Sequence, residues 1–178
     1  MDSITKLRLL GQVLLIVATI VAARAEASGG AFPLASSSPS SGPFFLPSGN
    51  AARFVTVTQK GEAEAGLTVV TEAVAIKETA PKAIIDKFGE VYTFSPAFIA
   101  VHRDQPTRID FWNLQPDDEH DFALVGPDFK ILMYEKLPPL QKISYIFTFH
   151  HEGVVDFKCL RHQPEMSGQI IVLPPVTR

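Results

Sequence analysis

Apolar and polar residues alternate over several short stretches of the chain, and this alternation is typical of half-buried β-strands. Residues 143–149 show the pattern clearly, with large apolar side chains at every second position. Turns that contain Gly and Pro separate the stretches, which favours a β-sandwich or a β-barrel. We therefore predict an all-β Greek-key fold, with one helical turn near residues 81–87. The predicted strands cover residues 53–58, 67–76, 91–94, 98–102, 107–114, 143–149, 154–159 and 168–173.

The N-terminal segment is typical of a secretory signal peptide. Lys6 and Arg8 precede an apolar run over residues 9–23, and small residues surround Ala25. The run is shorter than the roughly 20 residues that span a bilayer, which favours cleavage over retention as a membrane anchor. We predict a signal peptide at residues 1–25 and a mature protein without a membrane span, either periplasmic or secreted.

A segment rich in Ser, Pro and Gly follows at residues 26–52. Such a composition buries too little apolar surface to offset the entropy of ordering the chain. We predict a flexible linker here, in which Phe44, Phe45 and Leu46 are the residues able to dock on the following domain. The remaining residues, 53–178, form one predicted domain.

Charge is nearly balanced along the chain, and this limits the classes of partner. The 178 residues carry a formal net charge of −3 at pH 7, and no cluster of basic residues interrupts the domain. A nucleic-acid-binding protein would need a basic patch or stripe, so the sequence argues against that function.

Cys159 is the only cysteine, so an exported form of this chain has no internal disulfide. A leftover thiol in an oxidising compartment is a liability, an intermolecular bridge or a metal ligand. The sequence around it reads Cys159-Leu160-Arg161-His162-Gln163-Pro164-Glu165-Met166, and His120 lies upstream. One thiolate, two imidazoles and a weak thioether are the ligands that select copper for electron transfer.

The motif and its surroundings resemble the cupredoxins, the blue-copper proteins that include plastocyanin, pseudoazurin and azurin. The resemblance covers about residues 91–173, and it includes the Tyr92-Thr93-Phe94-Ser95-Pro96 stretch, Asn113, His120-Asp121-Phe122 and Phe157-Lys158-Cys159. It implies a cupredoxin-like Greek-key β-sandwich with one type 1 copper per chain. The implied ligands are His120, Cys159 and His162 in a plane, with Met166 as the long axial ligand.

The function that the resemblance implies is one-electron transport, not enzymatic catalysis. The implied partner is a redox protein that binds transiently to a monomer, and the implied electron port is the edge of His162 within a rim of Leu160 and Pro164. The alternative is a periplasmic protein that binds or delivers copper without redox cycling. We found no constellation of catalytic acids, bases or nucleophiles in the sequence.

Two features depart from the family pattern. Asp121 follows the first histidine, where many relatives have an Asn that clamps the ligand loops, and the spacing from His162 to Met166 differs from several members. A binuclear copper centre is excluded because it needs two cysteines. Zinc also binds thiolate and imidazole, but methionine is a poor zinc ligand. His102, His150 and His151 are expected to be solvated residues at turns, with a second copper-loading site as the alternative.

Overall fold

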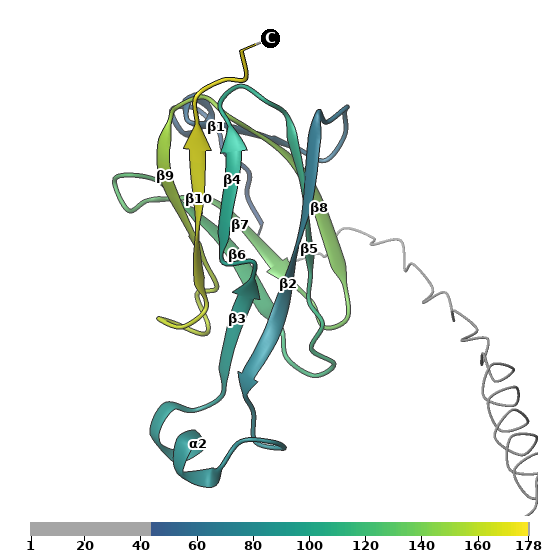
Figure 1. The fold of residues 1–178 in the computed structure, drawn as a ribbon, viewed down its shortest axis with the longest axis vertical. Helices are drawn as coiled ribbons and strands as arrows, with labels where there is room; N and C mark the ends of the chain where they lie inside the picture. The colour runs from purple at the N-terminus through teal and green to yellow at the C-terminus, as the bar shows by residue number, and fades with distance from the viewer. Residues whose placement is uncertain (1–43, 178) are drawn as a thin grey trace, which may run out of the picture. The chain divides into compact units, whose positions relative to one another are not determined.

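Two facing β-sheets form the structure, a computed structural model that describes residues 44–177. Both sheets are five-stranded and mixed, since β2 pairs with β5 and β4 with β10 in parallel. The first sheet has the order β1 (Val55–Thr58), β8 (Lys142–Phe149), β5 (Thr107–Trp112), β2 (Ala65–Ala75), β3 (Val91–Ser95) (Figure 1). The second has the order β4 (Phe98–His102), β10 (Ser167–Leu173), β9 (Gly153–Lys158), β6 (His120–Val125), β7 (Ile131–Leu137).

The core lies between the sheets and is rich in aromatic residues. Strands such as β5 alternate buried and partly exposed residues, because successive side chains point to opposite faces. Phe122 lies at the centre, with ring centroids 4.2 Å from Phe111 and 5.7 Å from Phe157. The predicted all-β sandwich is confirmed.

The number of strands differs from the prediction, because β6 and β7 were missed. All six residues of β6 are buried, so the strand has no alternation that could reveal it. In β7, Glu135 and Lys136 interrupt the apolar pattern, although Glu135 is itself buried. Within residues 44–177 there are therefore ten strands in place of the eight predicted.

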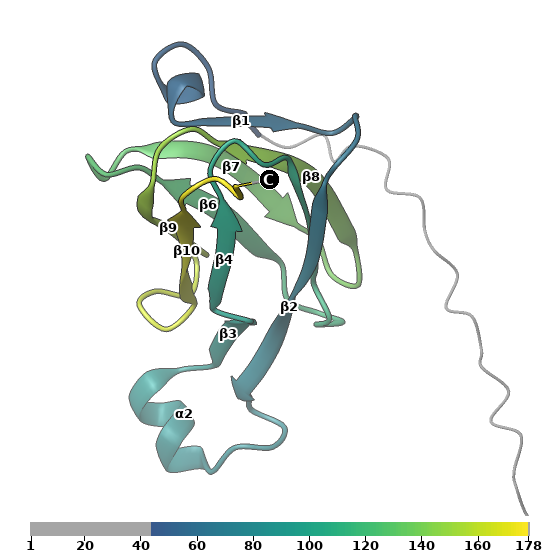
Figure 2. The ribbon, with the colours of Figure 1, turned by 45° about the horizontal axis from the view of Figure 1, so that its top comes forward.

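The predicted helical turn is present as α2 (Lys82–Phe88), inside the connection from β2 to β3. Gly89 ends the helix with a φ of 75°, a conformation that favours glycine. At the base of the connection, the Lys77 ammonium pairs with the Glu90 carboxylate over 3.1 Å. The connection extends beyond the ends of β2 and β3 (Figure 2).

The end of the predicted linker contacts the domain. Phe45 exchanges two backbone hydrogen bonds of 3.1 Å with Tyr134 on β7, and a short 3-10 helix follows at Ala51–Arg53. The predicted signal peptide and the linker up to residue 43 lie outside the described residues. Among residues 44–177, no helix is long and apolar enough to cross a membrane.

Three adjacent strands converge at one end of the second sheet. β6 begins with His120, β9 ends at Lys158, and β10 begins at Ser167, which pairs with Lys158. The antiparallel pairing of β9 with both neighbours therefore brings His120 and the β9–β10 loop to the same edge.

Candidate metal centre

The predicted ligands all lie at this end of the sandwich, on two segments. His120 is the first residue of β6, while Cys159, His162 and Met166 belong to the loop between β9 and β10. Cys159 follows Phe157 on the inward face of the strand, and both side chains are fully buried. The same strand alternation that builds the core thus carries the thiol to the edge of the core.

The two imidazoles and the thiol converge, as the sequence predicted. The Nδ1 atoms of His120 and His162 are 3.1 Å apart, and the Cys159 Sγ lies 3.5 Å from the His162 Nδ1. Potential ligand atoms of the three residues all lie within 4.8 Å of one another. Metal bonds of about 2.0–2.1 Å to nitrogen and about 2.3 Å to sulfur are compatible with this spacing. The three side chains therefore fit a single ion; their role as ligands stays a prediction.

Met166 is buried beside the cluster and closes the loop. Its backbone N–H donates to the His162 carbonyl over 2.9 Å, and its carbonyl accepts the Cys159 N–H over 3.0 Å. The side chain is fully buried and belongs to the same apolar cluster as Cys159. The position agrees with a ligand that closes the site from the core side, although its approach to a metal remains a prediction.

Gln163 braces the loop from within, a role that the sequence analysis missed. Its Nε2 donates to the Cys159 carbonyl over 2.6 Å and to the Met166 carbonyl over 3.0 Å. The side chain thereby joins the two ends of the loop, which limits the freedom of the thiol and of the thioether. A glutamine in a loop has no sequence signal that distinguishes this role from a solvated one.

Asp121 retains a link between the two ligand segments. Its Oδ1 accepts the backbone N–H of Leu160 over 2.6 Å, so the residue after His120 is tied to the residue after Cys159. The carboxylate is almost completely buried. In many relatives an Asn at this position clamps the ligand loops, and this chain has Asp121 instead. The link between the loops is nevertheless present, with a carboxylate oxygen as the acceptor.

Asn113 organises the loop that leads to His120. Its side-chain amide donates to the carbonyls of Asp118 and Leu137 over 2.7 and 2.8 Å. Its Oδ1 accepts the Thr71 hydroxyl and the Gln115 N–H, each over 3.0 Å. All polar capacity of this buried side chain is used, as buried amides require.

Tyr92, on β3 of the other sheet, packs against both histidines. Its ring centroid is 4.8 Å from that of His120 and 4.8 Å from that of His162. Its hydroxyl donates a hydrogen bond to the Asp118 carboxylate. The ring therefore holds both imidazoles from the facing sheet. Only the packing of the two sheets creates this contact.

Burial shifts the pKa values of the side chains in the cluster. Desolvation, followed by the neighbouring His162, lowers the pKa of His120 to about 4. Desolvation also raises the pKa of the Cys159 thiol and that of Asp121. His120 is therefore neutral near pH 7 with a lone pair free for a metal, whereas Cys159 must release a proton when a metal binds.

The second ring nitrogen of His120, Nε2, makes no hydrogen bond with any of the described residues, although it is buried. A histidine that binds a metal through Nδ1 carries its proton on Nε2, so this donor would lie in an apolar environment. The arrangement is compatible with Nδ1 as the atom directed at His162 and the thiol.

The two histidines differ in exposure. His120 is fully buried, whereas His162 is partly exposed. Leu160 is 42% exposed, and Pro164 is also exposed. The apolar residues predicted to surround the edge of His162 are thus on the surface.

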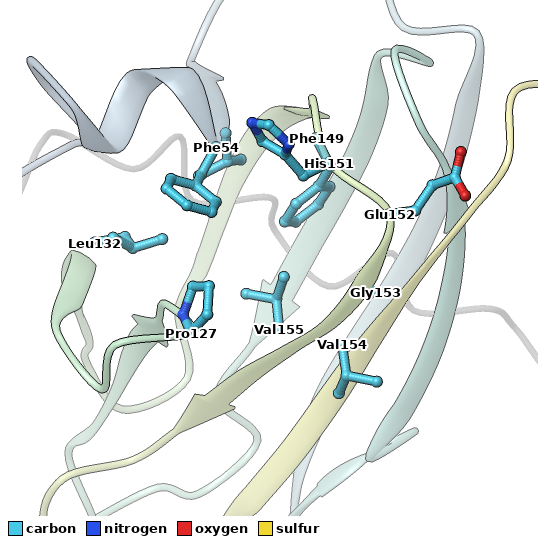
Figure 3. A pocket seen from close by; sticks show the side chains of 10 residues that line it. Phe54, Pro127, Leu132, Phe149, His151, Glu152, Gly153, Val154 and Val155 are labelled. Carbon is cyan, nitrogen blue, oxygen red and sulfur yellow. The ribbon is translucent and has the colours of Figure 1, made fainter.

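The remaining histidines serve structural contacts. The His150 Nδ1 donates to the Asp104 carboxylate and its Nε2 bonds to the Thr56 hydroxyl, each over 2.9 Å. The His102 Nδ1 donates to the Pro174 carbonyl over 2.6 Å. The His151 ring packs against Phe54, with centroids 5.0 Å apart and planes tilted by 45°, beside an apolar pocket at the opposite end of β9 (Figure 3). In residues 44–177, only His120, Cys159 and His162 form a group with metal-ligand spacing, so the alternative of a second copper-loading site gains no support.

Comparisons with known proteins returned structural neighbours only. No family model and no curated protein matches the sequence. Auracyanin B has 14% identity and a TM-score of 0.46, over 68% of this chain and 99% of its own. Auracyanin A, a "blue" copper protein from Chloroflexus aurantiacus, has 17% identity and a TM-score of 0.43, over 61% and 98%. A multicopper oxidase from Campylobacter jejuni has 9% identity and a TM-score of 0.48, over 64% and 31%.

At these identities and TM-scores, the similarities carry no information on individual site residues. The two mixed sheets and the thiol–imidazole cluster at their common end come from this chain's own residues. Together they are the features that the sequence analysis expected of a cupredoxin-like β-sandwich.

Proposed function

We propose that this protein is an exported mononuclear type 1 copper protein that carries single electrons between redox partners. The observation that supports the proposal most directly is the buried convergence of His120, Cys159 and His162. Met166, in the same loop, is the proposed axial ligand. Soft thiolate and thioether sulfur together with imidazole nitrogen is the donor set that selects copper for electron transfer.

Copper, one ion per chain, would supply the one-electron couple. The residues supply a rigid frame, because Asp121, Gln163 and Asn113 tie the segments that carry the ligands. A frame that moves little between two oxidation states lowers the reorganisation that accompanies electron transfer. We expect the protein to act as a carrier and not as an enzyme.

The partly exposed edge of His162 is the proposed electron port. Leu160 and Pro164, both exposed in the same loop, are expected to surround it with apolar surface, which would favour brief contact with a partner over a small interface. Export would follow from cleavage of residues 1–25, and residues 26–52 would tether the domain 53–178. We propose that the protein is a monomer that meets a transient redox protein.

The visible spectrum of the copper-loaded mature chain tests this function. An intense thiolate-to-Cu(II) band together with a reversible one-electron couple in voltammetry is the expected result. Tight binding of Cu(I) without that band would favour the alternative, a protein that binds or delivers copper without redox cycling. Preference for zinc over copper in competition would overturn both.

A further inference from the structure

The connection between β2 and β3 forms an arm next to the candidate metal centre. It contains α2 and leaves the sandwich at the end where β3 brings Tyr92 against both histidines. Two apolar side chains one helical turn apart are exposed on it, Ile84 at 39% and Phe88 at 54%. The Lys77–Glu90 ion pair joins the two strands of the arm at its base, so the arm has a defined origin.

A hollow lies between the base of this arm and the loop that precedes His120. Tyr92 is the one buried residue that lines it, and the other lining residues include four carboxylates against one ammonium group, Lys77. Glu90 is paired with Lys77, and Asp118 accepts the Tyr92 hydroxyl, whereas Glu78 and Asp117 are the exposed carboxylates of the hollow. The residues that line it are Ile76, Lys77, Glu78, Glu90, Tyr92, Gln115, Pro116, Asp117 and Asp118.

The basic residues of α2 offset this charge only in part, because five carboxylates (Glu78, Asp86, Glu90, Asp117 and Asp118) stand against three ammonium groups (Lys77, Lys82 and Lys87) over the arm and the hollow. The Lys82 ammonium is paired with Asp86 over 2.6 Å, and that of Lys87 lies 4.9 Å from the centroid of the Phe88 ring. The surface thus combines an apolar helix face with an acidic hollow. A complementary partner presents a lysine or arginine beside apolar surface, since opposite charges steer the encounter and apolar contact retains it.

We propose that the arm and the hollow are a docking surface for a positively charged redox protein, and this inference rests on the proposed function. A lysine or arginine of the partner enters the hollow, while Ile84 and Phe88 contact apolar surface beside it. The Tyr92 ring is the group that separates the hollow from both imidazoles. Copper, when bound by the proposed ligands, would supply the single electron that reduces an oxidised partner and would itself be oxidised from Cu(I) to Cu(II).

The double variant Glu78→Gln/Asp117→Asn tests the charge of the hollow. Its matched control is Glu62→Gln/Asp128→Asn, which changes the net charge equally at the opposite end of the sandwich. Oxidation of the Cu(I) protein is followed by stopped flow at about 10 mM ionic strength, where the Debye length is roughly 30 Å. The oxidants are the tris-phenanthroline cobalt(III) cation and the hexacyanoferrate(III) anion.

We expect the hollow variant to react about threefold or more slowly with the cation, because steering is lost, while its rate with the anion does not fall. The control should change the cation rate much less. An equal decrease in the control would assign the effect to net charge and overturn the docking surface. An unchanged cation rate in the hollow variant would overturn it as well.

The apolar half of the surface needs a protein probe. With a strongly basic cytochrome c as oxidant, Phe88→Ser should lower the bimolecular rate of electron transfer. The control is Phe129→Ser, which should not lower it; Phe129 is 85% exposed in the turn between β6 and β7, at the other end of the sandwich. Equal rates for the two variants would show that α2 does not contact the partner.

A binding measurement separates this inference from the function on which it rests. In the metal-free protein, tetralysine should shift the amide NMR signals of residues 76–78, 90, 115, 117 and 118, and these shifts should vanish in Glu78→Gln/Asp117→Asn. Scattered or absent shifts would overturn the docking surface. A protein without the blue band that still shows these local shifts would lose the proposed function but keep the cation-binding surface.

Discussion

The Asp121 carboxylate accepts the backbone N–H of Leu160 over 2.6 Å, and this one contact joins the segment of His120 to the loop of Cys159. Both ends of the bond lie directly after a proposed ligand. The bond therefore constrains the distance between the imidazole and the thiolate, although neither of its partners touches the metal position.

Replacing Asp121 tests this link. Asp121→Ala leaves the Leu160 N–H without its acceptor, and we expect copper to dissociate on the order of tenfold faster, the equivalent of about 1.4 kcal/mol. Asp121→Asn keeps an acceptor oxygen and should dissociate much more slowly than the alanine variant. Transfer of copper to a chelator measures both rates; equal rates for the two variants would show that the bond does not hold the loop.

Cys159 and Met166 should have separable roles. Cys159→Ser removes the thiolate, so it should abolish the visible band and most copper retention. Met166→Gln should keep a coloured site at a lower reduction potential, because the axial ligand tunes the potential more than it holds the metal. Absorption spectra and voltammetry distinguish the variants. Equal loss of copper from both, or a band that persists in Cys159→Ser, would refute the blue-copper assignment.

The exposure of the two histidines predicts different rescue by free imidazole. His162 is partly exposed, so His162→Gly leaves an opening at the surface that imidazole can enter. His120 is fully buried under Tyr92, and His120→Gly should need far more imidazole to restore the band. Titration of both variants with imidazole measures the difference. Rescue at the same concentration would contradict the predicted depth of His120.

Gly168 should be required for packing next to the ligand loop. A Cβ at this position would lie 2.3 Å from the Phe157 Cζ and 2.5 Å from the Ala97 carbonyl oxygen. We expect Gly168→Ala to lower the free energy of unfolding by about 1–3 kcal/mol or more. Gly66→Ala is the matched control in another strand, where the nearest atom is 3.7 Å away. Urea unfolding compares them, and equal stability would contradict the predicted overlap.

The stability of the metal-free protein should depend on His120 at mildly acidic pH. The pKa of His120 is about 4 in the folded protein, against an ordinary value of 6.5. Between these values the unfolded chain binds a proton that the folded protein does not, so the free energy of unfolding falls as the pH decreases. The slope approaches about 1.4 kcal/mol per pH unit for this one group.

Urea unfolding of the metal-free protein from pH 7 to pH 4.5 measures the slope. Other groups also titrate in this range, so the comparison is with His120→Gln, which should show a shallower decline. Identical declines would mean that burial does not hold His120 in its neutral form.

The local sequence determined eight of the ten strands and the grouping of three of the four proposed ligands. Alternation in residues 143–149 indicated a strand because one face of that strand is buried, and β6 escaped detection because both of its faces are. Cys159, His162 and Met166 could be grouped from the sequence because one short loop carries them. For such residues, spacing along the chain and proximity in space are nearly the same thing.

Tertiary structure decided the rest, since it arises from contacts between segments that are distant along the chain. Pairing of β6 with β9 brings His120 beside the loop, and the facing sheet places Tyr92 against two imidazoles. The carboxylate of Asp121 reaches Leu160 only in this arrangement. Residue types and local periodicity contain no record of such approaches, because the free energy that produces them comes from burying the core between two sheets.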